Sequence, residues 1–175
     1  MSTPELFPLD HDAFTADIRV IAAKVANDRD WQPTCLIGVG RGGLVPGAYL
    51  SHALGMTLLS VDYSSKDFGF ADELIHKLAY RTRQGEKLLV VDDINDSGRT
   101  IEQLRSSLSR FGGIEDNVRV AVVLNNSRSA AKADYWSQEI DRDVDKRWFV
   151  FPWEAMAPSE TLVEEALEVP ERLGG

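Results

Sequence analysis

The sequence has little cysteine, little histidine and no long apolar run. A lone cysteine, Cys35, leaves no partner for an internal disulfide. No apolar run approaches the ~20 residues of a membrane-spanning helix, and the start, MSTPELFPLD, lacks the basic and apolar regions of a secretory signal. His11, His52 and His76 are widely separated, without the spacing of zinc ligands. We therefore expect a cytoplasmic protein with no membrane span.

Basic residues are also in the minority. The chain has 19 Lys and Arg against 28 Asp and Glu, a net charge of −9. Binding to nucleic acid depends on Lys and Arg that neutralise phosphates, so we expect no nucleic-acid partner. A phosphate site in this chain must use a few local cations, backbone amides or a metal ion.

Apolar runs alternate with helical patterns along the chain. This alternation predicts an α/β fold in which helices flank a doubly wound, mainly parallel sheet, all in one domain over residues 1–175. The polar segment 64–85 shows no strand pattern, so we interpret it as a long loop or hairpin, a flexible hood inserted into the fold. The predicted strands are 34–39, 56–63, 87–91 and 118–124, and the predicted helices are 12–28, 44–54, 100–111 and 159–168.

The segment LLVVDDINDSGRT (88–100) joins an apolar strand, three carboxylates and the start of a helix. A helix N-terminus offers unpaired N–H groups and the positive end of the helix dipole, which favour a phosphate monoester. Ser97 and Thr100 add hydroxyl donors, Arg99 adds a cation, and Gly98 lets a ligand approach the backbone. The structural alternative, a buried strand with a helix-capping turn, needs only one such residue.

This segment resembles the PRPP-binding motif of type I phosphoribosyltransferases (PRPP is 5-phosphoribosyl 1-diphosphate). The resemblance implies that Asp92 and Asp93 bind the ribose hydroxyls and Mg²⁺, the metal directly or through water. It also implies that Asp96 lies near N7 of a purine as general acid and base. The residues it assigns to the 5-phosphate are Asp96, Ser97, Gly98, Arg99 and Thr100.

A second glycine-rich turn, GVGRGG (38–43), also follows a strand and precedes a helix. Alone it satisfies the G-x-G-x-x-G fingerprint, and with Asp62 after the next strand it predicts an NAD site. The longer stretch RGGLVPGAYLSHALGM (41–56) instead resembles the diphosphate loop of bacterial xanthine–guanine phosphoribosyltransferases. A purely structural tight turn is the third interpretation.

The diphosphate-loop interpretation implies that Arg41, Gly42 and Gly43 bind the diphosphate leaving group. The peptide before this arginine is often cis in the family that the stretch resembles. Related enzymes also close a hood over PRPP, and Lys66, beside two serines, suits a diphosphate contact. A solvated surface charge is the alternative for Lys66.

The segment 125–154 is the predicted base pocket. Within it, KRWFVFPWE (146–154) resembles the place where xanthine–guanine enzymes stack a purine, which assigns Trp148 and Phe149 to the base. The alternative is an aromatic core or a subunit contact. Where those enzymes carry a lysine for the 6-oxo group, this chain has Asn125, whose amide can both donate and accept.

Together the motifs predict an enzyme that transfers the phosphoribosyl group of PRPP to a purine base, hypoxanthine, guanine or xanthine, with Mg²⁺ in purine salvage. Most relatives are homodimers or homotetramers, and we expect the same here. Two alternatives stay open at this point: a non-catalytic sensor of PRPP or nucleotides on the same fold, and an NAD-binding protein.

Overall fold

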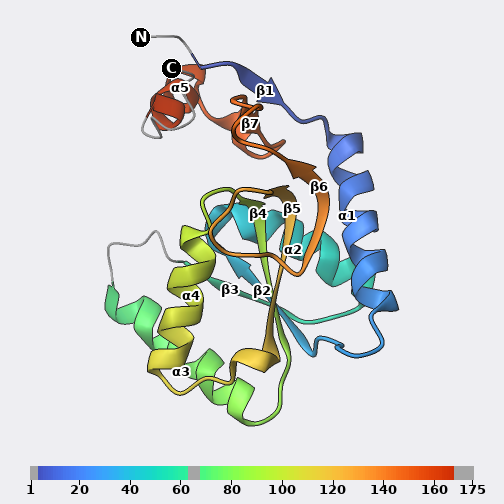
Figure 1. Cartoon of the computed structure of the whole chain (residues 1–175), viewed down its shortest axis with the longest axis vertical. Coiled ribbons are helices and arrows are strands. Elements are labelled where there is room, and N and C mark those ends of the chain that lie inside the picture. The colour runs from blue at the N-terminus through green and yellow to red at the C-terminus, as the bar shows by residue number, and fades with distance from the viewer. Residues whose placement is uncertain (1–3, 63–67, 168–175) are drawn as a thin grey trace.

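The computed structural model describes residues 4–62 and 68–167 (Figure 1). Its main sheet has five strands in the order β3-β2-β4-β5-β6, and every neighbouring pair is parallel. The predicted mainly parallel sheet is therefore confirmed. The strands are β2 (Cys35–Val39), β3 (Leu58–Val61), β4 (Leu88–Asn95), β5 (Val118–Asn126) and β6 (Tyr135–Ile140).

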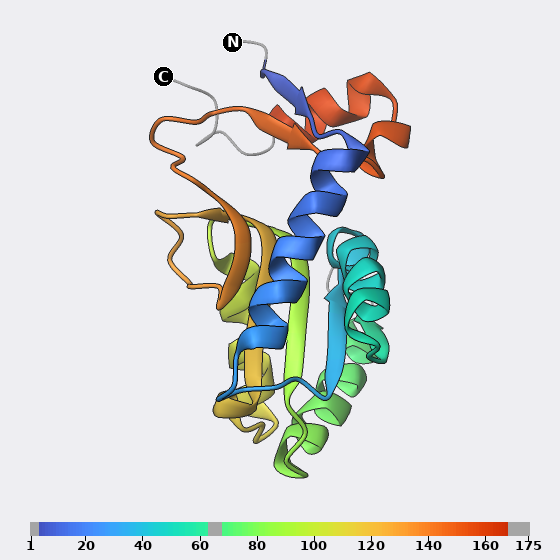
Figure 2. The same cartoon turned by 90° about the vertical axis from the view of Figure 1, so that its right-hand side faces the viewer.

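Helices cover both faces of this sheet. Helices α1 (His11–Asn27) and α2 (Gly40–Leu54) pack on one face, and α3 (Phe68–Arg83) and α4 (Arg99–Arg110) on the other (Figures 1 and 2). Alternate residues of β4 enter the two cores, which explains why the strands are nearly continuous apolar runs. In the described part of the chain, no helix is both long and apolar enough to cross a bilayer.

Helix α3 corrects the prediction for the segment 64–85. A loop or hairpin is wrong for Phe68–Arg83, because a parallel connection from β3 to β4 needs a crossover, and this helix provides it. Ile75, Leu78 and Ala79, at helical spacing, are buried against the sheet. Residues 63–67, which include Lys66, lie outside the described residues.

The crossover also places two arginines of the predicted hood segment 64–85, Arg81 and Arg83, away from the predicted ligand loops. Helix α3 runs back toward the start of β4, at the amino edge of the sheet. There Arg81 pairs with Glu86 at 2.5 Å, and Arg83 donates to the carbonyl of Phe111 at 2.6 Å. Both arginines therefore lie at the end of the sheet opposite the predicted PRPP loops.

The two ends of the chain form a small layer above the carboxyl edge of the sheet, which we call the cap (Figure 1). Its strands β1 (Leu6–Pro8) and β7 (Trp148–Val150) pair in parallel, separate from the main sheet. It continues into the short 3-10 helix η2 (Glu154–Met156) and α5 (Ser159–Leu167). The cap thus lies over the edge where ligands bind in open parallel sheets.

Candidate active site

The two glycine-rich corners lie side by side at the carboxyl ends of β2 and β4. These strands are direct neighbours, with Gly38 opposite Val91. A Cβ placed on Gly42 would lie 2.5 Å from Oδ2 of Asp93, so the first corner rests against the carboxylates of the second. Gly43 approaches the Val91 carbonyl so closely that no side chain fits there. This contact brings the two corners together at one edge of the sheet.

The first corner is the first turn of α2. The helix begins at Gly40, four residues before its predicted start, and Gly40 has a φ of +54°. Its N-cap, Val39, makes no side-chain capping hydrogen bond, so the N–H groups of the first turn have no capping side chain. Arg41 is exposed beside them. No described residue has a cis peptide, so the Gly40–Arg41 bond is trans.

Substituting Gly42 tests this contact. We expect Gly42→Ala to weaken PRPP binding at least tenfold with a small loss of stability, because the new methyl group displaces a side chain, Asp93, rather than backbone. Gly47→Ala, also in α2, is the matched control, since its Cβ meets the end of the Leu58 side chain at 3.0 Å. PRPP titration by calorimetry measures both. Equal PRPP affinity in the two variants would mean that Gly42 is not part of the PRPP site.

Asp92 and Asp93 follow the buried part of β4. Burial, and then the neighbouring charge of Asp93, raise the pKa of Asp92 well above its ordinary value. Oδ1 of Asp93 accepts a hydrogen bond from the Ile94 N–H at 2.7 Å. A desolvated carboxylate beside a second one favours ligands that donate hydrogen bonds or carry positive charge, such as ribose hydroxyls or a cation.

The same pair fits a magnesium ion that is shared with a substrate. No group of three or more Asp, Glu, His or Cys side chains in the described ranges could hold a metal by itself. Mg²⁺ usually binds one or two carboxylates and completes its shell with water and substrate phosphates. Asp92 and Asp93 could hold it in that way.

The second corner is a tight loop that leads into α4. Gly98 is the N-cap of this 12-residue helix, with a φ of +89° and no side chain to cap it, and Oγ of the preceding Ser97 accepts a hydrogen bond from the Arg99 N–H at 3.3 Å. Ser97, Arg99 and Thr100 are exposed around this N-terminus. Four of the five residues predicted to bind the 5-phosphate therefore surround one helix N-terminus.

Asn95, which the sequence analysis missed, braces this loop. Its Nδ2 donates to the Ala131 carbonyl at 2.8 Å, and its Oδ1 accepts from Ser129 Oγ at 2.9 Å. The N–H of Ala130 donates to the carbonyl of Ser97 at 3.2 Å. The segment after β5 thus fixes the loop from outside, by contacts that no local sequence pattern encodes.

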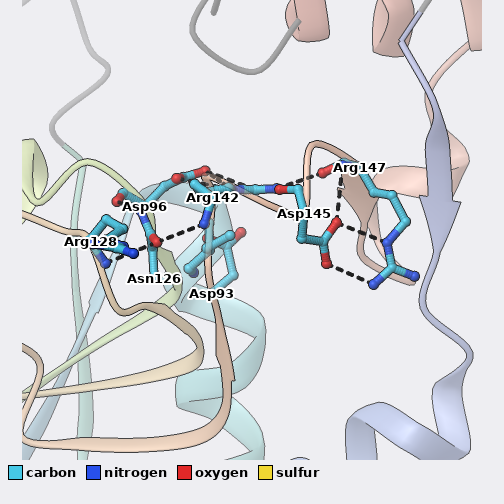
Figure 3. Close-up of polar contacts among 8 residues, drawn as sticks. Asp93, Asp96, Asn126, Arg128, Arg142, Asp145 and Arg147 are labelled. Atoms are coloured by element: carbon cyan, nitrogen blue, oxygen red, sulfur yellow. Dashed lines mark hydrogen bonds and ion pairs between the residues drawn. The ribbon is translucent and has the colours of Figure 1, made fainter. Parts of the chain in front are cut away.

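The remaining predicted residue of the loop, Asp96, pairs with Arg142. Nε of Arg142 lies 3.2 Å from both carboxylate oxygens and Nη2 lies 2.9 Å from Oδ2 (Figure 3). Both side chains are nearly buried, with 9% of Arg142 and 13% of Asp96 exposed. Charge-assisted bidentate pairs of this kind fix geometry strongly. The Asp96 side chain is therefore held in one orientation, directly after the end of β4.

A cavity of about 630 Å³ adjoins the first corner. It lies between the first turn of α2 and the cap, with Asp93 in its wall. Burial raises the pKa of Glu154, another wall residue, which accepts a hydrogen bond from the Phe151 N–H at 2.9 Å. The cavity gives a ligand at the first corner room to extend under the cap.

A family model for the phosphoribosyl transferase domain matches residues 9–159, which include both corners and the whole main sheet. The chain belongs to the phosphoribosyltransferase family. The predicted family and enzyme class are thereby confirmed.

Solved structures of phosphoribosyltransferases resemble this chain over most of its length. A purine phosphoribosyltransferase from Pyrococcus horikoshii Ot3 is 25% identical, with a TM-score of 0.61 over 87% of this chain and 96% of its own. The xanthine-guanine-hypoxanthine enzyme of Helicobacter pylori is 18% identical, with a TM-score of 0.63 over 92% and 99%. A hypothetical protein from Neisseria gonorrhoeae with bound ppGpp is 22% identical, with a TM-score of 0.67 over 99% and 100%. The last two likenesses concern the fold alone.

In the predicted base pocket of this phosphoribosyltransferase, hydrogen bonds within the protein already hold two asparagine side chains. Asn125 is buried, and its Oδ1 accepts from Asn95 Nδ2 at 2.9 Å. Asn126 instead faces the active-site loop: its Nδ2 donates to the Asp96 carbonyl and its Oδ1 accepts from the N–H of Arg142. A base contact by Asn125 stays a prediction, and its bond to Asn95 holds the side chain in one orientation.

The two aromatic residues of the predicted pocket differ in their surroundings. Trp148 is half-buried in β7. Phe149 is 8% exposed, its ring 5.8 Å from the Phe7 ring and 5.1 Å from the guanidinium carbon of Arg142. Of the two, Trp148 offers more ring surface to a stacked base, and the stacking of either stays a prediction.

Proposed function

We propose that this enzyme transfers the 5-phosphoribosyl group of PRPP to a purine base (hypoxanthine, guanine or xanthine), releasing diphosphate, in purine salvage. The observation that carries the proposal is the contact between the two corners, with Gly42 against Asp93. One corner suits a phosphorylated ribose and the other its diphosphate. The name of the Pyrococcus enzyme, a purine phosphoribosyltransferase, supports a purine as the base.

The proposed roles follow from the local chemistry. The N-terminus of α4, with Ser97, Gly98, Arg99 and Thr100, binds the 5-phosphate through N–H groups, hydroxyls and a cation. The first turn of α2, with Arg41, Gly42 and Gly43, binds the diphosphate. Lys66, from the hood, would add a cation to it.

Asp92 and Asp93 orient the ribose hydroxyls and hold Mg²⁺, directly or through water. When bound, the ion neutralises negative charge on the departing diphosphate. The C1–diphosphate bond loosens first, and the base nitrogen attacks C1 from the opposite face. Asp96 accepts the proton that the purine releases, while Trp148 stacks on the base.

An activity panel tests this proposal. Diphosphate release is measured with PRPP, Mg²⁺ and each of hypoxanthine, guanine, xanthine, adenine, uracil and orotate. We expect turnover with 6-oxopurines and none with the pyrimidines. Folded protein that turns over no base contradicts the proposal. The predicted cytoplasmic location and homodimer or homotetramer need separate measurements, fractionation and light scattering.

A non-catalytic sensor is the second candidate, favoured by one observation. The carboxylate assigned as proton acceptor, Asp96, is already engaged by Arg142 in a bidentate ion pair, so a purine would have to share its oxygens with the guanidinium. The panel separates the two candidates: a sensor binds PRPP in calorimetry but releases no diphosphate with any base.

A further inference from the structure

Arg142 lies in the loop between β6 and β7, where its guanidinium is held from several sides. Nη1 donates to the backbone carbonyls of Asp145 at 3.1 Å and Arg147 at 2.7 Å (Figure 3). Nε and Nη2 donate to Asp96, and the carbon of the guanidinium lies 5.1 Å from the Phe149 ring centre. The cation is therefore fixed before any ligand arrives.

A count of donors leaves one N–H of this guanidinium for a ligand. Arginine has five N–H donors. Nε uses one, Nη1 uses two on backbone carbonyls, and Nη2 uses one on Asp96. Among the described residues, none accepts from the second Nη2 hydrogen. This donor belongs to the same planar group that holds the Asp96 carboxylate.

The edge of a purine determines what such a donor meets. The substituent on C6 lies next to N7 on one edge of the base: an oxygen acceptor in guanine and hypoxanthine, an amino donor in adenine. When a purine gives its N7 proton to Asp96, its C6 substituent comes to lie beside Arg142, the ion-pair partner of Asp96. The spare N–H of Arg142 then faces an acceptor in a 6-oxopurine and another donor in a 6-aminopurine.

We propose that Arg142 determines the choice of base: it donates from Nη2 to the 6-oxo oxygen and rejects the 6-amino group by donor–donor repulsion. This inference rests on the proposed function, because it assigns the base to the carboxylate of Asp96. It gives the substrate class as 6-oxopurines and assigns their recognition to a residue outside the glycine-rich corners. A cation fixed against the proposed general base suits that task better than Asn125, whose Oδ1 is bonded to Asn95.

The first test compares catalytic efficiency for two bases in Arg142 variants. Because each well-placed contact to a base edge is worth ~1–3 kcal/mol, we expect Arg142→Gln to reduce the kcat/KM ratio of hypoxanthine to adenine by about 5- to 150-fold. Glutamine can turn its amide to either substituent. Arg142→Lys keeps a donor and a charge, and we expect it to retain more of the preference than Arg142→Gln.

Arg128→Gln is the matched control. Arg128 is 60% exposed and pairs with Asp141 at 3.2 Å on the neighbouring surface, so its loss leaves the ratio unchanged. A role of Arg142 limited to holding Asp96 lowers both rates together and leaves the ratio within about threefold of wild type. That outcome overturns the inference while the proposed function survives.

A binding measurement keeps the two proposals separate. Calorimetry with IMP and AMP needs no turnover, and wild type is expected to bind IMP at least tenfold more tightly. Arg142→Gln is expected to bring the two affinities within about threefold of each other. A wild-type protein that binds both nucleotides equally, or neither, overturns the assignment of Arg142, whereas an inactive protein that prefers IMP contradicts only the catalytic proposal.

Discussion

Asp96→Asn lowers kcat of phosphoribosyl transfer by about 10²- to 10⁴-fold, the usual contribution of a general base. Asparagine preserves the size and shape of the side chain but cannot take a proton from the purine. PRPP affinity changes little, because the N-terminus of α4 and the pair Asp92 and Asp93 remain. Initial rates at saturating PRPP and hypoxanthine, with PRPP calorimetry on the same sample, provide the measurement.

The ion pair with Arg142 makes a second variant necessary. Asp96→Asn leaves a nearly buried guanidinium without its carboxylate, which itself destabilises the fold. The double variant Asp96→Asn with Arg142→Gln removes both charges. We expect its melting temperature to return toward the wild-type value while kcat stays low, so lost rate and lost stability are distinguished.

Asp143→Asn is the control for charge alone. Asp143 is 69% exposed, and its carboxylate lies 3.4 Å from Arg128. It follows Arg142 in the chain but lies outside the loop between β4 and α4. Its rate stays within about twofold of wild type. A rate for Asp96→Asn that matches this control would assign proton transfer to another group and favour the sensor.

Local sequence was sufficient to predict the central strands and both glycine-rich corners. β2 is an apolar run and β4 begins as one, and a glycine-rich turn leads from each into a helix. Both corners therefore had to lie at one edge of the sheet. The predicted extents were less accurate: β4 continues to Asn95 through the two aspartates, and α2 includes the glycines.

Features that depend on distant partners were not predicted. Strands β1 and β7 have three residues each and are stabilised by pairing with each other, 142 residues apart at Leu6 and Trp148. Helix α3 buries Ile75, Leu78 and Ala79 at helical spacing, a pattern that the interpretation of this segment as a polar loop overlooked. Its position as the β3 to β4 crossover could have revealed it.

Arg142 was missed for a related reason. It lies 46 residues from Asp96, in a stretch of alternating charges that reads as a solvated surface loop. One available signal was the chemistry of the motif itself. A carboxylate enclosed by strand ends requires a cation, and the predicted base pocket, 125–154, carries several arginines.

Gly98→Ala is the substitution with the largest expected effect on the fold and on PRPP binding together. An added Cβ would collide with the backbone N of Ala131 and lie 2.9 Å from Ser129 Oγ, in the segment that braces the loop. A non-glycine residue at a φ of +89° adds strain of about 1–2 kcal/mol. Neither neighbour can move without breaking the hydrogen bonds of Asn95. We therefore expect loss of the 5-phosphate site as well as lower stability.

Gly85→Ala is the control that distinguishes the steric collision at Gly98 from the backbone strain of a non-glycine residue at positive φ. Gly85 has a φ of +86°, and a Cβ there meets nothing within 4 Å, so it carries the strain alone. Urea unfolding should place Gly98→Ala about 1–3 kcal/mol below Gly85→Ala, the usual cost of overpacking. Calorimetry should show wild-type PRPP affinity in Gly85→Ala and none in Gly98→Ala. Equal unfolding free energies of the two variants would mean that the segment after β5 moves to accommodate the new methyl group. Wild-type PRPP affinity in Gly98→Ala would mean that the 5-phosphate does not bind at the N-terminus of α4.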